Sequence, residues 1–133
     1  MKLVSVVLAV LILYVFIESQ QCDSTCQASR ATSSFLGKSQ SSQQVIDFLN
    51  EYKGEAPGAA IYGEFVNWGI RNSNKFVEIT NHPNTTKRNL ELIAYAIADY
   101  GNHAKWCEIY SDLTVKENDQ YIRSRLLGCN YKL

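Results

Sequence analysis

The sequence predicts a mainly α-helical fold, with four or five short helices around a central helix near residues 86–100 and two disulfides. Apolar residues recur every three or four positions in several segments, which is typical of amphipathic helices. Capping residues and glycines mark where these segments begin and end. Four cysteines follow an apolar leader, a combination typical of extracellular proteins. The alternative is an α+β fold with one or two β-hairpins, because residues 59–80 and 104–128 fit both helical and strand patterns.

The N-terminus has the pattern of a secretory signal peptide. Lys2 precedes an apolar run from Leu3 to Ile17, Glu18 ends the run, and Ser19 supplies a small residue for cleavage. A membrane anchor is the alternative, but a spanning helix needs about 20 apolar residues, and this run is shorter. We therefore expect residues 1–19 to be removed and the mature chain to be secreted into the extracellular space.

The charges of the chain are balanced. Lys and Arg together number 13, as do Asp and Glu, and the predicted signal peptide removes one charge of each sign. A neutral chain lacks the excess of positive charge that attracts phosphate backbones or anionic lipids. We therefore expect no nucleic-acid partner, and no membrane association after signal cleavage.

The four cysteines, Cys22, Cys26, Cys107 and Cys129, predict two disulfides, because their number is even and the compartment is oxidising. If residues 22–26 are helical, the first two thiols point along one face and do not pair readily. We therefore expect both to pair with the C-terminal cysteines, which would join the two ends of the domain. A Cys107–Cys129 bridge across a hairpin, with Cys22 paired to Cys26, is the competing arrangement. A four-cysteine zinc site is disfavoured, because the C-terminal pair is too widely spaced.

Residues 20–40 are rich in Ser, Thr and Gln, and Phe35 and Leu36 are the only large apolar residues there. This composition predicts a tether held by its cysteines, with at most one helical turn. A single globular domain is expected to occupy residues 41–133.

The domain is expected to begin with a helix, because Ser41 and Gln44 have the spacing of a capping box and Gly54 can end it. Its apolar residues at helical spacing are Val45, Ile46, Phe48, Leu49 and Tyr52. Residues 57–70 are ambiguous. We favour a helix starting at Pro57, despite three glycines (Gly58, Gly63 and Gly69), followed by a short extended segment over residues 75–80.

The strongest helical pattern belongs to the expected central helix, with Asn84 or Thr85 as the N-cap and Gly101 after the last turn. Its apolar stripe comprises Leu90, Ile93, Ala94, Ile97 and Ala98. Residues 104–115 fit a helix and a strand equally well. The last segment is expected to be a helix that begins at Asn118 or Asp119 and stops at Gly128.

No motif for a nucleophile, a phosphate loop or a metal centre is present, so we expect no catalytic residues, no metal site and no cofactor. His82 precedes Pro83 in a loop, and His103 follows the central helix. Asp99 and His103 are four residues apart, but Gly101 lies between them and breaks the helix. The scattered carboxylates that could pair in space are Glu51, Glu55, Glu64, Glu78 and Glu91.

Two features suggest contacts at the surface. Tyr95 and Tyr100 lie off the apolar stripe of the central helix, and tyrosine is enriched at protein interfaces. Asn84-Thr85-Thr86 is an N-glycosylation sequon, so Asn84 is the candidate glycan site.

These observations favour a small secreted, non-catalytic protein that binds another extracellular protein. One alternative is a carrier of a small apolar ligand. The other is a secreted hydrolase that uses Asp99 with His103, or a pair of the scattered carboxylates.

Overall fold

A computed structural model describes residues 2–20, 22–38, 40–51, 57–111 and 116–130. Within these ranges the secondary structure is entirely helical, which confirms the mainly α prediction and leaves no hairpin there. The helices are α1 (Lys2–Gln20), α2 (Ser24–Leu36), α3 (Ser42–Glu51), α4 (Pro57–Arg71), α5 (Ser73–Thr80), α6 (Lys87–Tyr100), α7 (His103–Ser111) and α8 (Asp119–Arg123).

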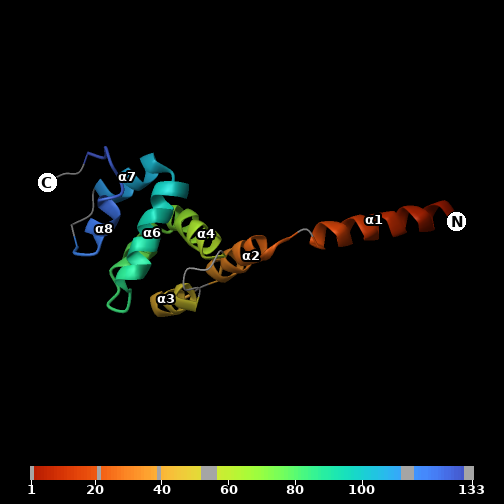
Figure 1. Ribbon diagram of the computed structural model, residues 1–133, viewed down its shortest axis with the longest axis horizontal. Helices are drawn as coiled ribbons and strands as arrows, with labels where there is room; N and C mark the ends of the chain where they lie inside the picture. The colour runs from red at the N-terminus through yellow and green to blue at the C-terminus, as the bar shows by residue number, and fades with distance from the viewer. Residues whose placement is uncertain (1, 21, 39, 52–56, 112–115, 131–133) are drawn as a thin grey trace.

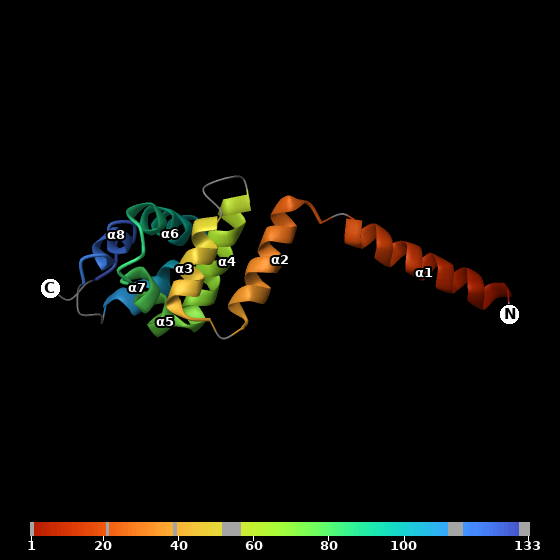
Figure 2. The ribbon, with the colours of Figure 1, turned by 90° about the horizontal axis from the view of Figure 1, so that it is seen from below.

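Helices α2 to α8 form one packed body, and α1 projects away from it (Figure 1). Helix α2 lies along α4, α4 also contacts α6, and α6 contacts α8 (Figure 2). Helix α3 packs against α5. The large apolar side chains of α1 from Leu3 to Ile17 are exposed. Across the described ranges, no helix combines the length and the apolar character needed to cross a membrane.

The tether expected over residues 20–40 is instead the helix α2, so this prediction was wrong. Asp23 caps the helix, because its Oδ1 accepts a hydrogen bond of 2.8 Å from the Cys26 amide. The face that α2 buries carries Ala28, Thr32 and Leu36. The Thr32 hydroxyl donates to the Ala28 carbonyl at 2.7 Å, so its burial leaves no unpaired polar atom. Small residues such as Ala28 and Thr32 allow close contact between helices but give no apolar pattern in the sequence.

Helix α3 begins at the predicted capping box. The Gln44 amide donates to Ser41 Oγ at 3.2 Å, and the Ser41 amide donates to Gln44 Oε1 at 2.8 Å. The buried Ser42 hydroxyl and the Lys75 ammonium both donate to the carboxylate of Glu78 in α5, and these bonds lower the pKa of that carboxyl. The contact fastens α3 to α5. The expected end of α3 at Gly54 lies outside the described residues.

Helix α4 confirms the helical interpretation of residues 57–70. The prediction of an extended segment over residues 75–80 was wrong. These residues belong to α5, which buries Phe76, Ile79 and Thr80 on one helical face. Phenylalanine and β-branched residues fit a strand locally, but a three-residue spacing buries a face only in a helix.

The central helix of the prediction is α6. Its N-cap is Thr86, whose Oγ1 accepts from the Asn89 amide at 3.2 Å, rather than Asn84 or Thr85. Ala96 is buried, and the predicted core residue Ala98 is exposed, because Ala96 and not Ala98 lies on the face turned to the body. Helix α6 shares its central position with α4, which contacts α2, α5, α6 and α7.

Residues 104–111, which fitted a helix and a strand equally well, are helical and belong to α7. Helix α8 ends at Arg123 and does not reach Gly128. Gly128 has a positive φ of 82°, a conformation that favours glycine.

A row of aromatic rings connects α4, α5 and α7. The ring of Phe76 lies 4.9 Å from that of Phe65 and 4.6 Å from that of Trp106, and Trp106 is followed by Tyr110 at 6.1 Å. All four side chains are buried. Phe76 fits only because Gly69 has no side chain: a Cβ there would lie 2.3 Å from the Phe76 ring. The aromatic row therefore depends on a glycine inside a helix.

The substitution Gly69→Ala should destabilise the protein by about 2 kcal/mol, because the new methyl group overpacks the Phe76 ring. Gly63→Ala in the same helix is the matched control, since its Cβ meets only the Tyr100 ring at an ordinary 3.8 Å. That control should stabilise the helix by about 0.5–1 kcal/mol. Urea unfolding followed by circular dichroism measures both changes. Equal stabilities of the two variants would contradict the packing described here.

Candidate functional site

The structure pairs Cys22 with Cys26 and Cys107 with Cys129. The expected bridges between the two ends of the domain were therefore wrong, and the competing arrangement is correct. The expectation that a Cys107–Cys129 bridge would come with a hairpin was also wrong, since this bridge joins α7 to the segment that follows α8.

Cys22 pairs with Cys26 because only one of the two lies inside a helix. Asp23 is the N-cap of α2 with an extended backbone, so Cys22 precedes the helix and Cys26 lies in its first turn. The chain turns at Asp23, and the two Cα atoms are 5.2 Å apart, within the range that a disulfide spans. The sequence argument placed both thiols on one helical face, and that condition is not met.

Cys129 reaches Cys107 through a turn at Gly128. The positive φ of Gly128 redirects the chain after α8, and the Cα atoms of Cys107 and Cys129 lie 5.4 Å apart. Arg123 holds the same region to α7, because its Nη2 donates to the Tyr110 carbonyl at 2.5 Å.

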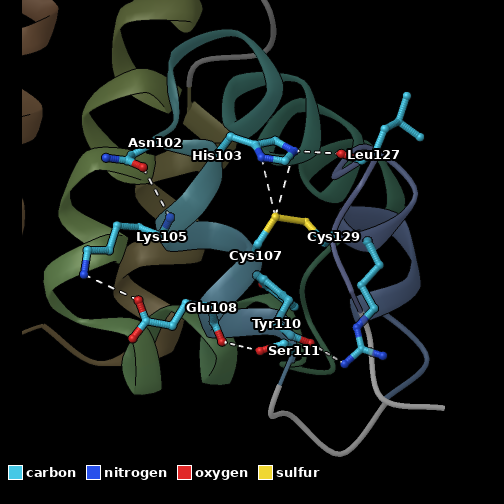
Figure 3. The surroundings of a disulfide bond; sticks show 10 residues. Asn102, His103, Lys105, Cys107, Glu108, Tyr110, Ser111, Leu127 and Cys129 are labelled. Carbon is cyan, nitrogen blue, oxygen red and sulfur yellow. Dashed lines mark hydrogen bonds and ion pairs between the residues drawn. A yellow bond between two sulfur atoms is a disulfide. The ribbon is translucent and has the colours of Figure 1, made fainter.

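His103 lies directly beside this disulfide, on the turn of α7 that precedes Cys107 (Figure 3). Its Nδ1 is 3.5 Å from Cys107 Sγ, and its Nε2 is 2.9 Å from the Leu127 carbonyl oxygen. A carbonyl oxygen only accepts hydrogen bonds, so Nε2 carries the hydrogen and donates it to Leu127. The neutral ring therefore presents the Nδ1 lone pair to the sulfur, and the protonated ring presents an N–H donor. We call His103, Cys107 and Cys129 the histidine–disulfide cluster.

The cluster is open to solvent. His103 is exposed, and both cysteines are partly exposed. The neighbouring charges on α7 pair with each other, since Lys105 Nζ lies 3.4 Å from Glu108 Oε2. The sulfur beside His103 is therefore accessible to an external reactant.

The three side chains also have the composition of a metal site. One ligand atom from each lies within 4.8 Å of the others. The two sulfurs are bonded to each other, however, and only a thiolate is a strong metal ligand. The cluster is thus a histidine beside a disulfide, and it has free thiols to offer a metal only after reduction.

The partner of His103 is Cys107, and not Asp99, which the sequence offered as an alternative. Asp99 belongs to α6 and His103 begins α7, so the two do not share a helical face. His103 and Cys107 are four residues apart within one helix, which places them on the same face. The spacing of these two residues was the available signal in the sequence, and it was missed because residues 104–115 fitted a helix and a strand equally well.

The two candidate contact tyrosines face different neighbours. Tyr95 stacks under the guanidinium of Arg125, 4.3 Å from its ring centroid, and its hydroxyl accepts from Arg125 Nη2 at 3.0 Å. The Tyr100 ring lies over Gly63 of α4. They are 50% and 56% exposed, and Leu127 is 79% exposed, so among the described residues outside α1 these are the exposed large apolar side chains.

The sequon residue Asn84 is exposed in the loop before α6. Its Nδ2 donates to Gln43 Oε1 at 2.5 Å, and its backbone amide donates to His82 Nδ1 at 3.2 Å. Because Thr86 caps the helix, the Asn84 amide is not needed for capping. A glycan on Asn84 would give up only the bond to Gln43.

A surface groove of about 500 Å³ lies between α3, α4 and α6, with Leu49, Tyr62 and Leu92 among its lining residues. The buried Tyr62 hydroxyl donates to Asn89 Oδ1 at 3.2 Å, and Asn89 Nδ2 donates to Asn50 at 2.8 Å. Burial raises the pKa of Tyr62 to about 12, so its hydroxyl stays protonated. The groove combines apolar walls with a fixed polar network.

Most of the scattered carboxylates bond to other side chains. Glu64 accepts from the Ser29 hydroxyl at 2.5 Å, and Glu91 lies 4.0 Å from Lys87 Nζ. Glu78 binds Ser42 and Lys75, as described above. The expected carboxylate Glu55 lies outside the described residues.

No protein-family model, no curated protein and no solved structure matches this chain. The interpretation of the histidine–disulfide cluster and of the contact between Tyr95 and Arg125 is therefore based only on the geometry of this structure.

The two disulfides should differ in their contribution to stability. Replacing both Cys107 and Cys129 by alanine should cost about 3 kcal/mol, because the bridge spans a sequence separation of 22 residues. Replacing both Cys22 and Cys26 should cost about 2 kcal/mol, because that separation is only 4 residues. Urea unfolding of the two double variants gives the comparison. A larger loss for the Cys22–Cys26 pair would contradict the loop-entropy argument.

Proposed function

We propose that this chain is a secreted protein whose first 19 residues are a signal peptide, and that it acts outside the cell by binding another protein. The observation that carries the proposal is the position of α1. This helix projects from the packed body (Figure 2). Its large apolar side chains from Leu3 to Ile17 are exposed. A helix that adds nothing to the core can be removed without loss of packing, as a signal peptide is.

The cysteines support an oxidising compartment. Those in the described ranges are all in disulfides, and both bridges are partly exposed. Disulfides of this kind persist in extracellular proteins and are rare where thiols are kept reduced.

The binding surface in this proposal is the Tyr95 surface, formed by Tyr95, Arg125 and Leu127. The Arg125 guanidinium holds the Tyr95 ring by a cation–π contact and a hydrogen bond, so the aromatic side chain is ordered before a partner arrives. Tyrosine and arginine are among the residues that contribute most to protein interfaces. Leu127, two residues after Arg125 in the sequence, adds an exposed apolar side chain.

The carrier of a small apolar ligand is the second candidate, and the groove beside Tyr62 favours it. Its apolar walls could hold such a ligand, while Asn89 and Asn50 could orient a polar end.

When the full chain is expressed in eukaryotic cells, the medium should contain a protein that begins at Gln20. Intact-mass and N-terminal peptide analysis measure this directly, and the same mass shows whether Asn84 carries a glycan that Asn84→Gln removes. Leu11→Arg should abolish secretion, because a charge interrupts the apolar run. Retention of wild-type protein in the cell with residues 1–19 attached would refute the secretion part.

The Tyr95 surface is tested with a photo-crosslinking residue at position 127, where the side chain is 79% exposed and replacement spares the core. Crosslinking in the extracellular fluid should capture a defined protein. Tyr95→Ala should weaken this binding about tenfold, and Tyr100→Ala should leave it unchanged.

Three results would count against this surface. Equal effects of the two tyrosine substitutions would do so, and so would the absence of any captured protein. A native mass spectrum with extra mass that leaves on denaturation would instead favour the carrier.

A further inference from the structure

We propose that the Cys107–Cys129 disulfide is an exchangeable bond that reacts with the dithiol of another molecule, with Cys107 as the leaving thiolate and His103 as the group that supplies its proton. This reactivity concerns the histidine–disulfide cluster alone, so it does not depend on the binding function proposed above.

The first argument is the position of the imidazole. Nδ1 of His103 lies 3.5 Å from Cys107 Sγ, and the bond from Nε2 to the Leu127 carbonyl fixes the direction of the ring (Figure 3). A protonated histidine beside a sulfur stabilises the thiolate of that sulfur. A sulfur whose thiolate is stabilised leaves faster in thiol–disulfide exchange. His103 therefore favours departure of Cys107 over departure of Cys129.

The second argument is access. Both cysteines are partly exposed, and Cys129 lies in the segment beyond α8, between the turn at Gly128 and the end of the described chain. An attacking thiolate can therefore reach the bond from solvent.

The reaction proceeds in two steps. A thiolate of the dithiol attacks Cys129 Sγ, the S–S bond breaks, and its electron pair goes to Cys107 Sγ, which takes the proton from Nδ1 of the His103 imidazolium. The second thiolate of the dithiol then attacks the first sulfur of the same dithiol, which is bonded to Cys129 in the mixed disulfide. This step releases Cys129 as a thiolate, which is protonated by water. The dithiol is oxidised to a disulfide, and two electrons and two protons reach the cysteines. His103 regains its proton from solvent.

The Cys22–Cys26 disulfide is a control within the same molecule. Its two cysteines are also partly exposed. The Asp23 carboxylate next to it accepts the Cys26 amide at 2.8 Å. His103, by contrast, contacts the sulfur of Cys107 in the other disulfide. The two disulfides therefore have similar exposure, and the imidazole contact distinguishes Cys107–Cys129 from Cys22–Cys26.

The first experiment treats the folded protein with dithiothreitol and quantifies reduction of each disulfide by alkylation and peptide mapping. His103→Gln should slow reduction of Cys107–Cys129 about tenfold, and reduction of Cys22–Cys26 should not change. Lys105→Gln, on the same helix, should affect neither bond, and circular dichroism confirms that each variant is folded. Unchanged reduction of Cys107–Cys129 in His103→Gln, or an equal slowing of both bonds, would overturn the proposal.

The second experiment needs no variant. Wild-type protein is exposed briefly to the monothiol 2-mercaptoethanol, and free thiols are alkylated at once. The mixed disulfide should form mainly on Cys129, with the alkyl group on Cys107, because His103 makes Cys107 the leaving sulfur. An equal distribution, or a mixed disulfide mainly on Cys107, would overturn the assigned roles.

Discussion

The contact between the Phe76 ring and Gly69 is the constraint on which the rest of the helical body depends. It brings α5 against α4 closely enough for Phe76 to lie between Phe65 and Trp106. Trp106 in turn fixes the start of α7. A similar restriction applies at Gly101, where a Cβ would lie 2.5 Å from the Ile97 carbonyl and 2.8 Å from the Trp106 ring. Two residues without side chains thus position the helix that carries the histidine–disulfide cluster.

Local signals in the sequence predicted the elements that local interactions determine. The capping box of Ser41 and Gln44 is present as expected, and residues 57–70 are helical despite their glycines. Helix α2 was missed because its buried face consists of small and polar residues, whose burial is possible only once α4 is in place. Residues 75–80 were read as extended because their composition suits a strand, while their burial on one helical face comes from tertiary contacts. The predictions of secondary structure were therefore more reliable where a cap fixes the backbone than where packing against a distant helix does.

The errors at the cysteines come from the positions of helix boundaries. The disfavoured Cys22–Cys26 pairing assumed that both residues were helical, but the cap at Asp23 leaves Cys22 outside the helix. His103 was expected to follow the end of the central helix in a segment of undecided structure, whereas it begins α7, and this helix makes Cys107 its neighbour. The bond to Leu127 that orients the ring comes from a residue 24 positions away, and no spacing in the sequence indicates it.

Because each disulfide is local, no covalent bond other than the chain itself links α2 to the helices that follow. Helix α2 is attached through its buried face and through the bond between Ser29 and Glu64. Cleavage of one peptide bond between α2 and α3 would therefore leave α2, with the Cys22–Cys26 bridge intact, as a separate peptide held to the body only by non-covalent contacts. An end-to-end disulfide would have kept such a fragment attached. Helix α2 is in this sense a detachable part, because after cleavage at that connection it could leave the body without any reducing agent.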